Sequence, residues 1–319
     1  MRQFALAALL PAAALAEVPQ VVTDIPPVHS LAAMAMEGLG EPALLVPGGT
    51  SPHDFALRPS DARALEAAGL VILNGGGLAQ AAERAAADLA PSAVRIDLMD
   101  LPETRRLPAR EGASLEAHDH DDEHGEAGHE GAHGHEDGDG DHDGHAQGDV
   151  DPHGWLDPAN GKVWLAAIAD ALAASDPGNA DRYAANAVAG AGLIDAAAAA
   201  AREALAPVAD APFLVAHDSL GYFEEAFGLA ATGAVAGLDA AAPGPRRVEG
   251  ARAALEGSGA ACVFTEVGES SPLAGRVVEG TAAAVVEIDP LGARQGPGPG
   301  LYPALIERLA ADMAGCLGG

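Results

Sequence analysis

Four of the twelve histidines in this 319-residue chain stand apart from the others, each in a distinctive local sequence. His53 lies in SPHDFALRPSD after a predicted strand, His153 lies in VDPHGWLDP, and His217 ends the apolar run FLVAH. Imidazole nitrogen binds zinc, nickel, copper and iron. Because three independent segments each supply one histidine at a strand end or loop, we interpret His53, His153 and His217 as one metal site. His29, at the start of the first predicted helix, is interpreted as a structural histidine. Its position places it near the mouth of the cleft in which we expect the metal site to lie.

Two carboxylates occupy strand ends of the same kind as that of His217. Glu266 ends the run ACVFTE, and Asp289 ends AAVVEID. Ligands of parallel α/β sheets gather at the carboxyl ends of the strands, so both carboxylates can face the cleft that the three histidines face. Carboxylate oxygen can complete a tetrahedral or expanded zinc site. Three imidazoles and one carboxylate therefore suit zinc.

The other eight histidines lie in a segment of unusual composition, at about residues 111–151. This segment carries fifteen Asp and Glu, no Lys or Arg, and almost no large apolar side chains. It cannot bury a core, so we expect a disordered surface loop. Flexible histidines lose more entropy on chelation than a preformed site does, which predicts weak accessory metal binding. The alternative is a solvated insertion whose charge only keeps the protein soluble. The eight are His118, His120, His124, His129, His133, His135, His142 and His145.

Outside this loop, short apolar runs alternate with longer Ala- and Leu-rich stretches of helical spacing, separated by Gly, Pro, Asn or Asp. This alternation is typical of an α/β fold with parallel sheets and helices on both faces. The predicted strands are 18–24, 42–46, 70–75, 213–217, 261–266 and 283–289. The predicted helices are 29–39, 60–68, 78–89, one beginning near 158, then 221–227, 246–257 and 302–317.

The length exceeds the usual size of one domain, so we expect two α/β lobes. The first would span 17–176 and include the acidic loop, and the second would span 207–319. Between them, 177–206 is mostly Ala with scattered charges and predicts one rigid helix of roughly 40 Å. The alternative is two shorter helices broken near Gly190 and Gly192, because each glycine weakens a helix by about 1 kcal/mol.

The first sixteen residues have the pattern of a signal peptide. MRQFALAALLPAAALA contains one basic residue, Arg2, then an apolar run, and it ends in an A-x-A cleavage signal formed by Ala14 and Ala16. The run is too short for a membrane anchor, which needs about 20 apolar residues. We therefore expect export and a soluble protein outside the cytoplasm.

The formal net charge of −30 bears on which partners the protein can bind. Such a charge disfavours nucleic-acid phosphates and anionic lipid surfaces and favours cations. The two cysteines, Cys262 and Cys316, lack C-x-x-C spacing, so a Cys-based zinc site is disfavoured. Export into an oxidising compartment favours a disulfide between them over two unpaired buried thiols.

Five segments together resemble a known protein family. They are SPHDFALRPSD, DPHGWLDP, VAHDSLGYFEEAFGL, CVFTEVG and IDPLG, and a His- and Asp-rich insertion lies between the first and the second. In this order and spacing, from about Val21 to Cys316, the chain is similar to the periplasmic zinc-binding subunit of ABC-type zinc transporters, among the cluster A-I metal-binding solute-binding proteins. DPLG alone would be a weak signal, whereas five motifs in register are specific.

The resemblance implies two Rossmann-like lobes joined by one long helix, with the metal in the cleft between them. His53, His153 and His217 match the family's three zinc-binding histidines, and Asp289 matches the carboxylate beside the metal. It also implies a high-affinity zinc-binding protein of the periplasm that delivers Zn²⁺ to the membrane permease of an ABC transporter. We expect a monomer that does not bind nucleic acid.

The family resemblance does not decide which group is the fourth zinc ligand. Some zinc-binding members have Glu immediately before the first histidine, where this chain has Pro52. The fourth position is therefore left among Asp289, water and Glu266. In manganese-binding relatives the metal ligands resemble a set of His, His, Glu and Asp. This chain has His217 at the third position of the set, which favours zinc. In the same family, the positions of Cys262 and Cys316 match a disulfide of the C-terminal domain.

A zinc hydrolase is the main alternative from another functional class, because three histidines with an open fourth position also describe catalytic zinc. Asp289 or Glu266 could serve as its general base. However, the chain contains no H-E-x-x-H or comparable catalytic spacing. We therefore expect no enzymatic activity. A metal buffer or chaperone without a transporter is opposed only by the family resemblance.

Overall fold

The computed structural model describes residues 18–110, 150–268 and 272–319. Its first sheet contains four parallel strands in the order β2-β1-β3-β4. The central strands, β1 (Val21–Thr23) and β3 (Leu70–Leu73), are buried at every position, which explains their continuous apolar sequences. The edge strands, β2 (Ala43–Leu44) and β4 (Val94–Asp97), are partly exposed.

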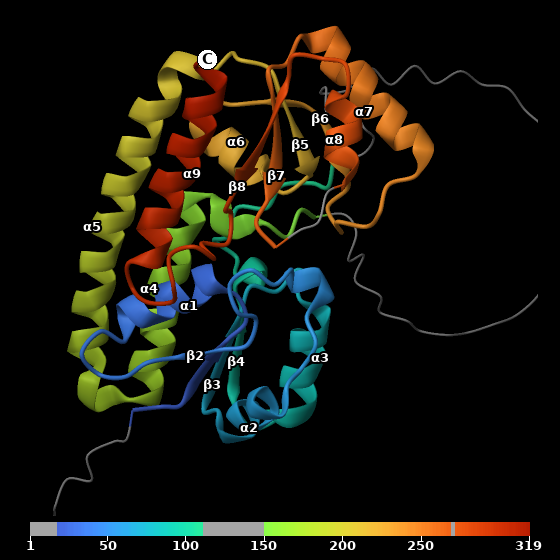
Figure 1. The fold of residues 1–319 in the computed structure, drawn as a ribbon. Coiled ribbons are helices and arrows are strands. Elements are labelled where there is room, and N and C mark those ends of the chain that lie inside the picture. The colour runs from blue at the N-terminus through green and yellow to red at the C-terminus, as the bar shows by residue number, and fades with distance from the viewer. Residues whose placement is uncertain (1–17, 111–149, 269–271) are drawn as a thin grey trace, which may run out of the picture.

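Helices cover this first sheet on two sides. Figure 1 shows α1 (Pro26–Ala35) on one side, and α2 (Pro59–Ala67) and α3 (Gln80–Leu89) on the other. The next long helix, α4 (Pro158–Ser175), packs against α1. It begins with an Asp157 side chain that accepts a hydrogen bond from the backbone N–H of Ala159, and Pro158 follows at the first helical position.

The second sheet repeats the topology of the first. Its parallel strands follow the order β6-β5-β7-β8, which is the same pattern as β2-β1-β3-β4. The strands are β5 (Phe213–His217), β6 (Ala231–Ala236), β7 (Cys262–Glu266) and β8 (Ala284–Ile288). The accompanying helices are α6 (Gly221–Phe227), α7 (Pro245–Ser258), α8 (Pro272–Val278) and α9 (Leu301–Leu317). The prediction of an α/β fold with two parallel sheets is confirmed.

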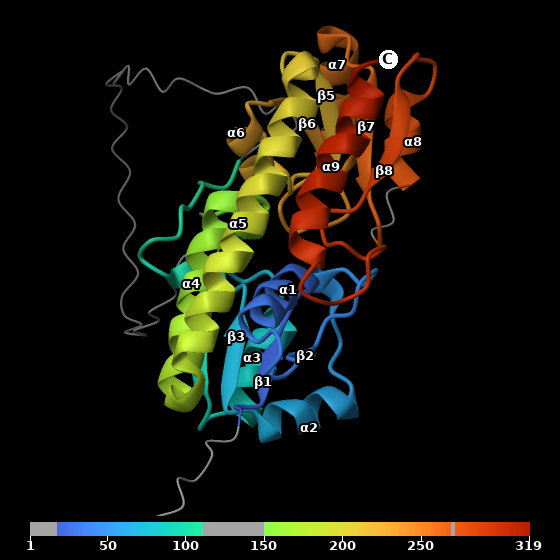
Figure 2. The same cartoon turned by 90° about the vertical axis from the view of Figure 1, so that its left-hand side faces the viewer.

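One continuous helix, α5 (Ala180–Leu205), runs beside both sheets (Figures 1 and 2). The alternative of two shorter helices is wrong, because α5 passes through Gly190 and Gly192 without a break. At Gly190 a Cβ atom would lie 2.8 Å from Cδ2 of Leu165 and 3.2 Å from Sδ of Met34, so glycine permits close helix packing there. The stretch 177–208 is long and apolar enough to cross a membrane by length and composition, but α5 packs against α4 and α9.

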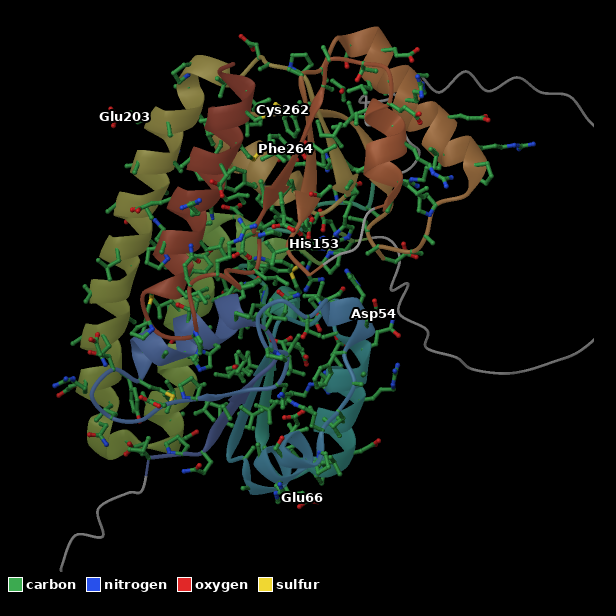
Figure 3. The ribbon with its side chains drawn as sticks, in the orientation of Figure 1. Asp54, Glu66, His153, Glu203, Cys262 and Phe264 are labelled. Atoms are coloured by element: carbon green, nitrogen blue, oxygen red, sulfur yellow. A yellow bond between two sulfur atoms is a disulfide. The ribbon has the colours of Figure 1, made fainter. Side chains whose placement is uncertain are left out.

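The strand order places the carboxyl ends of the central strands at the middle of the molecule. In each sheet the chain turns in opposite directions from the two central strands, β1 and β3 in the first and β5 and β7 in the second. Such a switch point opens a crevice at the strand ends, where α/β proteins bind ligands. Figure 3 shows His153 between the two sheets, at this level.

The predicted disulfide is present. Cys262 on β7 and Cys316 on α9 are bonded, with their Cα atoms 6.3 Å apart. The bond attaches the last helix to a central strand of the second sheet. The alternative of two unpaired thiols is therefore wrong.

Candidate metal centre

Three histidines from separate segments converge between the two sheets. Nitrogen atoms of His53, His153 and His217 all lie within 4.8 Å of one another. The ring centroids are 6.0 Å apart for His53 and His153, 5.5 Å for His53 and His217, and 5.0 Å for His153 and His217. Zn–N bonds of about 2.0–2.1 Å in tetrahedral geometry place two nitrogens roughly 3.4 Å apart. A small inward movement of the three rings would therefore bring these nitrogens to the spacing of a zinc site.

His53 comes from the first half of the chain, on a short 3-10 turn (Pro52–Asp54) between β2 and α2. Pro52 presets the backbone at the start of this turn. His53 is half-buried, whereas His153 and His217 are buried. The side of the site that His53 covers is therefore the side nearest to solvent.

His153 lies on the segment that leads into α4. Its Nδ1 atom is 2.7 Å from Oδ1 of Asp151, and the same oxygen accepts a hydrogen bond from the His153 backbone N–H at 2.9 Å. The preceding carbonyl, that of Pro152, accepts a hydrogen bond from Nδ2 of Asn74 at the end of β3. Two residues further on, Nε1 of Trp155 donates to the carbonyl of Pro290. The backbone on both sides of His153 is therefore fixed.

His217 is the last residue of β5, which places it at the switch point of the second sheet. Its Nε2 atom lies 3.1 Å from the carbonyl oxygen of Leu238, and its Nδ1 atom lies 3.3 Å from Oε1 of Glu266. The hydroxyl of Ser219 donates to the same Glu266 oxygen. Glu266 ends β7, the neighbour of β5, so parallel pairing brings these two strand ends together.

The environment keeps two of the histidines, His53 and His153, neutral. Burial, followed by the neighbouring rings of His153 and His217, lowers the pKa of His53 to about 4. Burial also lowers the pKa of His153 well below its ordinary value, and the His217 ring adds to this effect. Burial would raise the pKa of Glu266, but the His217 imidazole and the Ser219 hydroxyl outweigh it and hold that pKa below its usual value. Neutral imidazoles beside an ionised carboxylate are prepared for a cation.

The space between these side chains is very small. The cavity has a volume of about 10 Å³, which matches a single water molecule or ion. The three histidines and Glu266 line it together with Ser51, Pro52, Leu78, Trp155, Val267 and Leu291. The apolar members exclude water from most of the site, so charges inside it interact strongly.

Two further sequence candidates lie outside the histidine cluster. Both carboxylate oxygens of Asp289 accept backbone hydrogen bonds at 2.8 Å, from Ala293 and from Arg294. Among the described residues, neither Asp289 nor Glu266 is in the group whose ligand atoms all lie within 4.8 Å of one another. His29 is buried at the start of α1, with Nε2 at 3.0 Å from the carbonyl oxygen of Pro42. The eight histidines of the acidic loop lie outside the described residues.

Sequence reasoning missed the residues that contact the histidines of the cluster and their partners. Asp151 stands two positions before His153 in the quoted VDPH motif, yet no role was assigned to it. Ser219, two positions after His217, was likewise given none. A local signal existed for both, because a polar side chain two residues from a buried histidine can bond the ring or its partner. The role of the Leu238 carbonyl had no such signal, because a backbone atom leaves no trace in the residue type.

The chain matches a known family along nearly its whole length. The family model described as "Zinc-uptake complex component A periplasmic" covers residues 21–316. The chain belongs to this family. The high-affinity zinc uptake system protein ZnuA of Paracoccus denitrificans is 41% identical over 317 residues, covering 98% of this chain and 97% of that protein. The protein of the same name from Brucella abortus is 40% identical over 304 residues, covering 93% and 91%.

Solved structures share the fold of this family member. A crystal structure of ZnuA aligns with a TM-score of 0.72 at 21% identity, covering 94% of this chain and 99% of that one. The periplasmic zinc-binding protein TroA from Treponema pallidum aligns with a TM-score of 0.75 at 19% identity, again covering 94% and 99%. At these identities the likeness concerns the fold, and it agrees with the expected two-lobe α/β architecture.

Proposed function

We propose that this protein binds Zn²⁺ at high affinity in the periplasm and delivers it to the membrane permease of an ABC transporter. The observation that carries the proposal is the convergence of His53, His153 and His217, whose nitrogens lie within 4.8 Å of one another. Family membership supports the transport role, since the similar proteins from Paracoccus and Brucella are named as zinc uptake components.

The chemistry of the three donors favours zinc over harder cations. Neutral imidazole suits zinc, whereas manganese, magnesium and calcium prefer oxygen ligands. The lowered pKa values of His53 and His153 keep both rings unprotonated at neutral pH, so no proton has to leave either ring before the metal binds. The cavity of about 10 Å³ fits an ion and leaves little room for an organic substrate, which supports a binding protein rather than a hydrolase.

For the fourth position of the site, Glu266 is the carboxylate that the geometry favours. Its Oε1 atom is 3.3 Å from Nδ1 of His217, and the residue lines the cavity. We propose that the ion is completed here, by the Glu266 carboxylate or by a water molecule that it binds. Asp289 instead holds the loop after β8, because both of its oxygens are bonded to backbone N–H groups of that loop.

The proposal extends to how the chain is organised and where it acts. Residues 1–16 act as a signal peptide, 17–176 and 207–319 form two lobes, and 177–206 joins them. The mature protein acts as a monomer with no enzymatic activity of its own. The histidines of the acidic loop bind additional zinc weakly.

Release of zinc to the permease requires the two halves that share the site to separate, because neither half contains all three imidazoles.

Metal analysis of the untagged protein purified from the periplasm tests the proposal. We expect one tightly held zinc per molecule after weakly bound metal has been removed by brief exposure to a mild chelator. Competition among zinc, manganese and nickel should leave zinc in the tight site. Tight stoichiometric manganese, or no tightly bound metal, would contradict the assignment. Co-purification with the permease of a zinc ABC transporter separates the transport role from that of a free metal buffer.

A further inference from the structure

Asp151 is a buried carboxylate that contacts His153 twice. Its Oδ1 atom accepts a hydrogen bond from the His153 backbone N–H at 2.9 Å and lies 2.7 Å from Nδ1 of the same residue. The exposed fraction is 3% for the Asp151 side chain and 2% for that of His153. A carboxylate in this place accepts the Nδ1 proton of the imidazole. The other ring nitrogen, Nε2, is then the one that carries a lone pair for a metal.

The second half of the chain holds Asp151 in position. Its carbonyl oxygen accepts a hydrogen bond from the hydroxyl of Tyr222 on α6 at 3.0 Å. Its backbone N–H donates to the carbonyl of Leu107 at 2.9 Å, and the Leu107 N–H in turn donates to the Tyr222 hydroxyl. Asp151 therefore connects a ligand carried by the segment before α4 with a helix of the second sheet.

A glycine leaves the space that the Asp151 carboxylate occupies. At Gly221, the first residue of α6, a Cβ atom would lie 2.9 Å from Oδ2 of Asp151 and 3.5 Å from Nη2 of Arg110. Arg110 is itself bonded to Glu224, with Nη1 at 2.8 Å from Oε2, and to Asp218. Any larger residue at 221 would push the Asp151 carboxylate against these neighbours.

We propose that Asp151 is a positioning residue of the metal centre: it fixes the tautomer and the ring orientation of His153 so that Nε2 binds the ion. The inference rests on the proposed function, because it concerns a ligand of the same site. A carboxylate behind a metal-bound imidazole raises the basicity of the ring and restricts its rotation, and its loss typically costs about 10–100-fold in metal affinity. Asp151 acts through His153 and does not contact the metal.

The test replaces Asp151 with the isosteric amide. Asp151→Asn should weaken zinc binding about 10–100-fold in a chelator competition assay. The matched control is Asp157→Asn, six positions further on and also buried. Asp157 caps α4 through the N–H of Ala159, and asparagine caps helices equally well, so this variant should keep wild-type zinc affinity. Equal affinities for wild type and Asp151→Asn would overturn the inference.

A double-mutant cycle separates positioning from general support of the fold. In a His153→Ala background, Asp151→Asn should have no further effect on zinc affinity, because its partner is gone. An equal loss in both backgrounds would mean that Asp151 acts elsewhere, and the inference would be wrong. Nitrogen chemical shifts of the His153 ring should show Nδ1 protonated in the wild-type apoprotein, and Nε2 protonated would contradict the mechanism.

A second variant, at Gly221 in the other half of the chain, displaces the same Asp151 carboxylate. Gly221→Ala should lower zinc affinity through displacement of Asp151, and this loss should also vanish in the His153→Ala background. The Gly221→Ala variant keeps the inference testable if Asp151→Asn fails to fold. If Gly221→Ala lowers zinc affinity by the same factor in the His153→Ala background as in the wild type, the inference is wrong. The proposed function fails separately, if the wild-type protein itself binds no zinc tightly.

Discussion

The rings of His153 and His217 lie with their centroids 5.0 Å apart, although one residue precedes α4 and the other ends β5 of the second sheet. Each is buried, and each has a carboxylate at its Nδ1 atom: Asp151 at 2.7 Å for His153 and Glu266 at 3.3 Å for His217. Each half of the chain therefore contributes to the site a buried histidine with a carboxylate beside it.

The lowered histidine pKa values predict that zinc binding resists mild acid. Protons compete for His53 only near pH 4 rather than near its usual value of 6.5. Three histidines of ordinary pKa would together lose about a thousandfold in affinity between pH 7 and pH 5.5. We expect a loss of less than about tenfold over this range, with a steep decline toward pH 4. Calorimetric titration with zinc at several pH values measures it, and a midpoint of loss near pH 6.5 would contradict the account.

The same shift predicts how the stability of the apoprotein depends on pH. Between about pH 6.5 and about pH 4, the unfolded chain binds a proton at His53 that the folded chain does not bind. The contribution of His53 to stability is therefore largest above pH 6.5 and declines as the pH falls through this window. Thermal unfolding of the metal-free wild type and of metal-free His53→Ala isolates this contribution: the wild type should lose stability relative to His53→Ala as the pH falls from 6.5 to 5. A wild type that gains stability relative to the variant over this range would contradict the sign.

Glu266 and Asp289 should respond differently to neutralisation. Glu266→Gln removes a charge that lines the cavity, so zinc affinity should fall by about tenfold or more. Asp289→Asn weakens the hydrogen bonds to Ala293 and Arg294, so it should lower the melting temperature with little change in zinc affinity. Chelator competition and thermal unfolding on both variants distinguish the two roles. The reverse pattern would restore Asp289 as the fourth ligand.

Two glycines of α5 offer a matched test of helix packing. A Cβ atom at Gly192 would meet no atom within 4 Å outside the helix's own backbone. Gly192→Ala should therefore stabilise the protein by up to about 1 kcal/mol. Gly190→Ala places a methyl 2.8 Å from Leu165 Cδ2, so it should be neutral or destabilising, by up to about 3 kcal/mol. Denaturant unfolding measures both, and equal stabilisation by the two substitutions would contradict the packing of α5 on α4.

Removal of residues 113–148 tests whether the loop histidines bind zinc weakly and the cleft histidines bind it tightly. The deletion removes all eight loop histidines and leaves His53, His153 and His217 in place. We expect the weak zinc sites to disappear and the tight site to keep its affinity. Calorimetry on the deletion variant resolves the two classes of site. Loss of the tight site would show that the cleft is not where zinc binds.

Much of the fold could be predicted because periodicity and burial agree. The central strands β1, β3 and β5 are entirely buried, so their apolar runs are unmistakable. Two strands were missed: β4 (VRID) is a partly exposed edge strand with charged residues, and β6 (ATGAVA) consists mainly of small residues. Although β4 carries Val94 and Ile96, it is short and has charged residues at its other two positions, and β6 lacks the bulky side chains that identify a strand. The short helix α8 was also missed, because its sequence PLAGRVV contains a glycine and two valines, which are poor helix formers.

The three histidines could be named because each stands in a loop or at a strand end, where α/β proteins gather their ligands. The distances among them could not be predicted, since they depend on the register of β5 with β7 and on the packing of two sheets. The contacts of Asp289 were also beyond sequence reasoning. Its place after β8 suggested that it faces the cleft, whereas the hydrogen bonds that both of its oxygens accept from the backbone of 293–294 leave no sign in the residue types.

Calorimetric zinc titration of His53→Ala, His153→Ala and His217→Ala tests the central claim most directly. His29→Ala, which removes a histidine outside the cluster, is the control. Each of the three cleft variants should lose at least about a hundredfold in affinity for the tight zinc, because each removes one of the protein's imidazole ligands. The control should bind as the wild type does. Unchanged affinity in all three cleft variants would contradict the account.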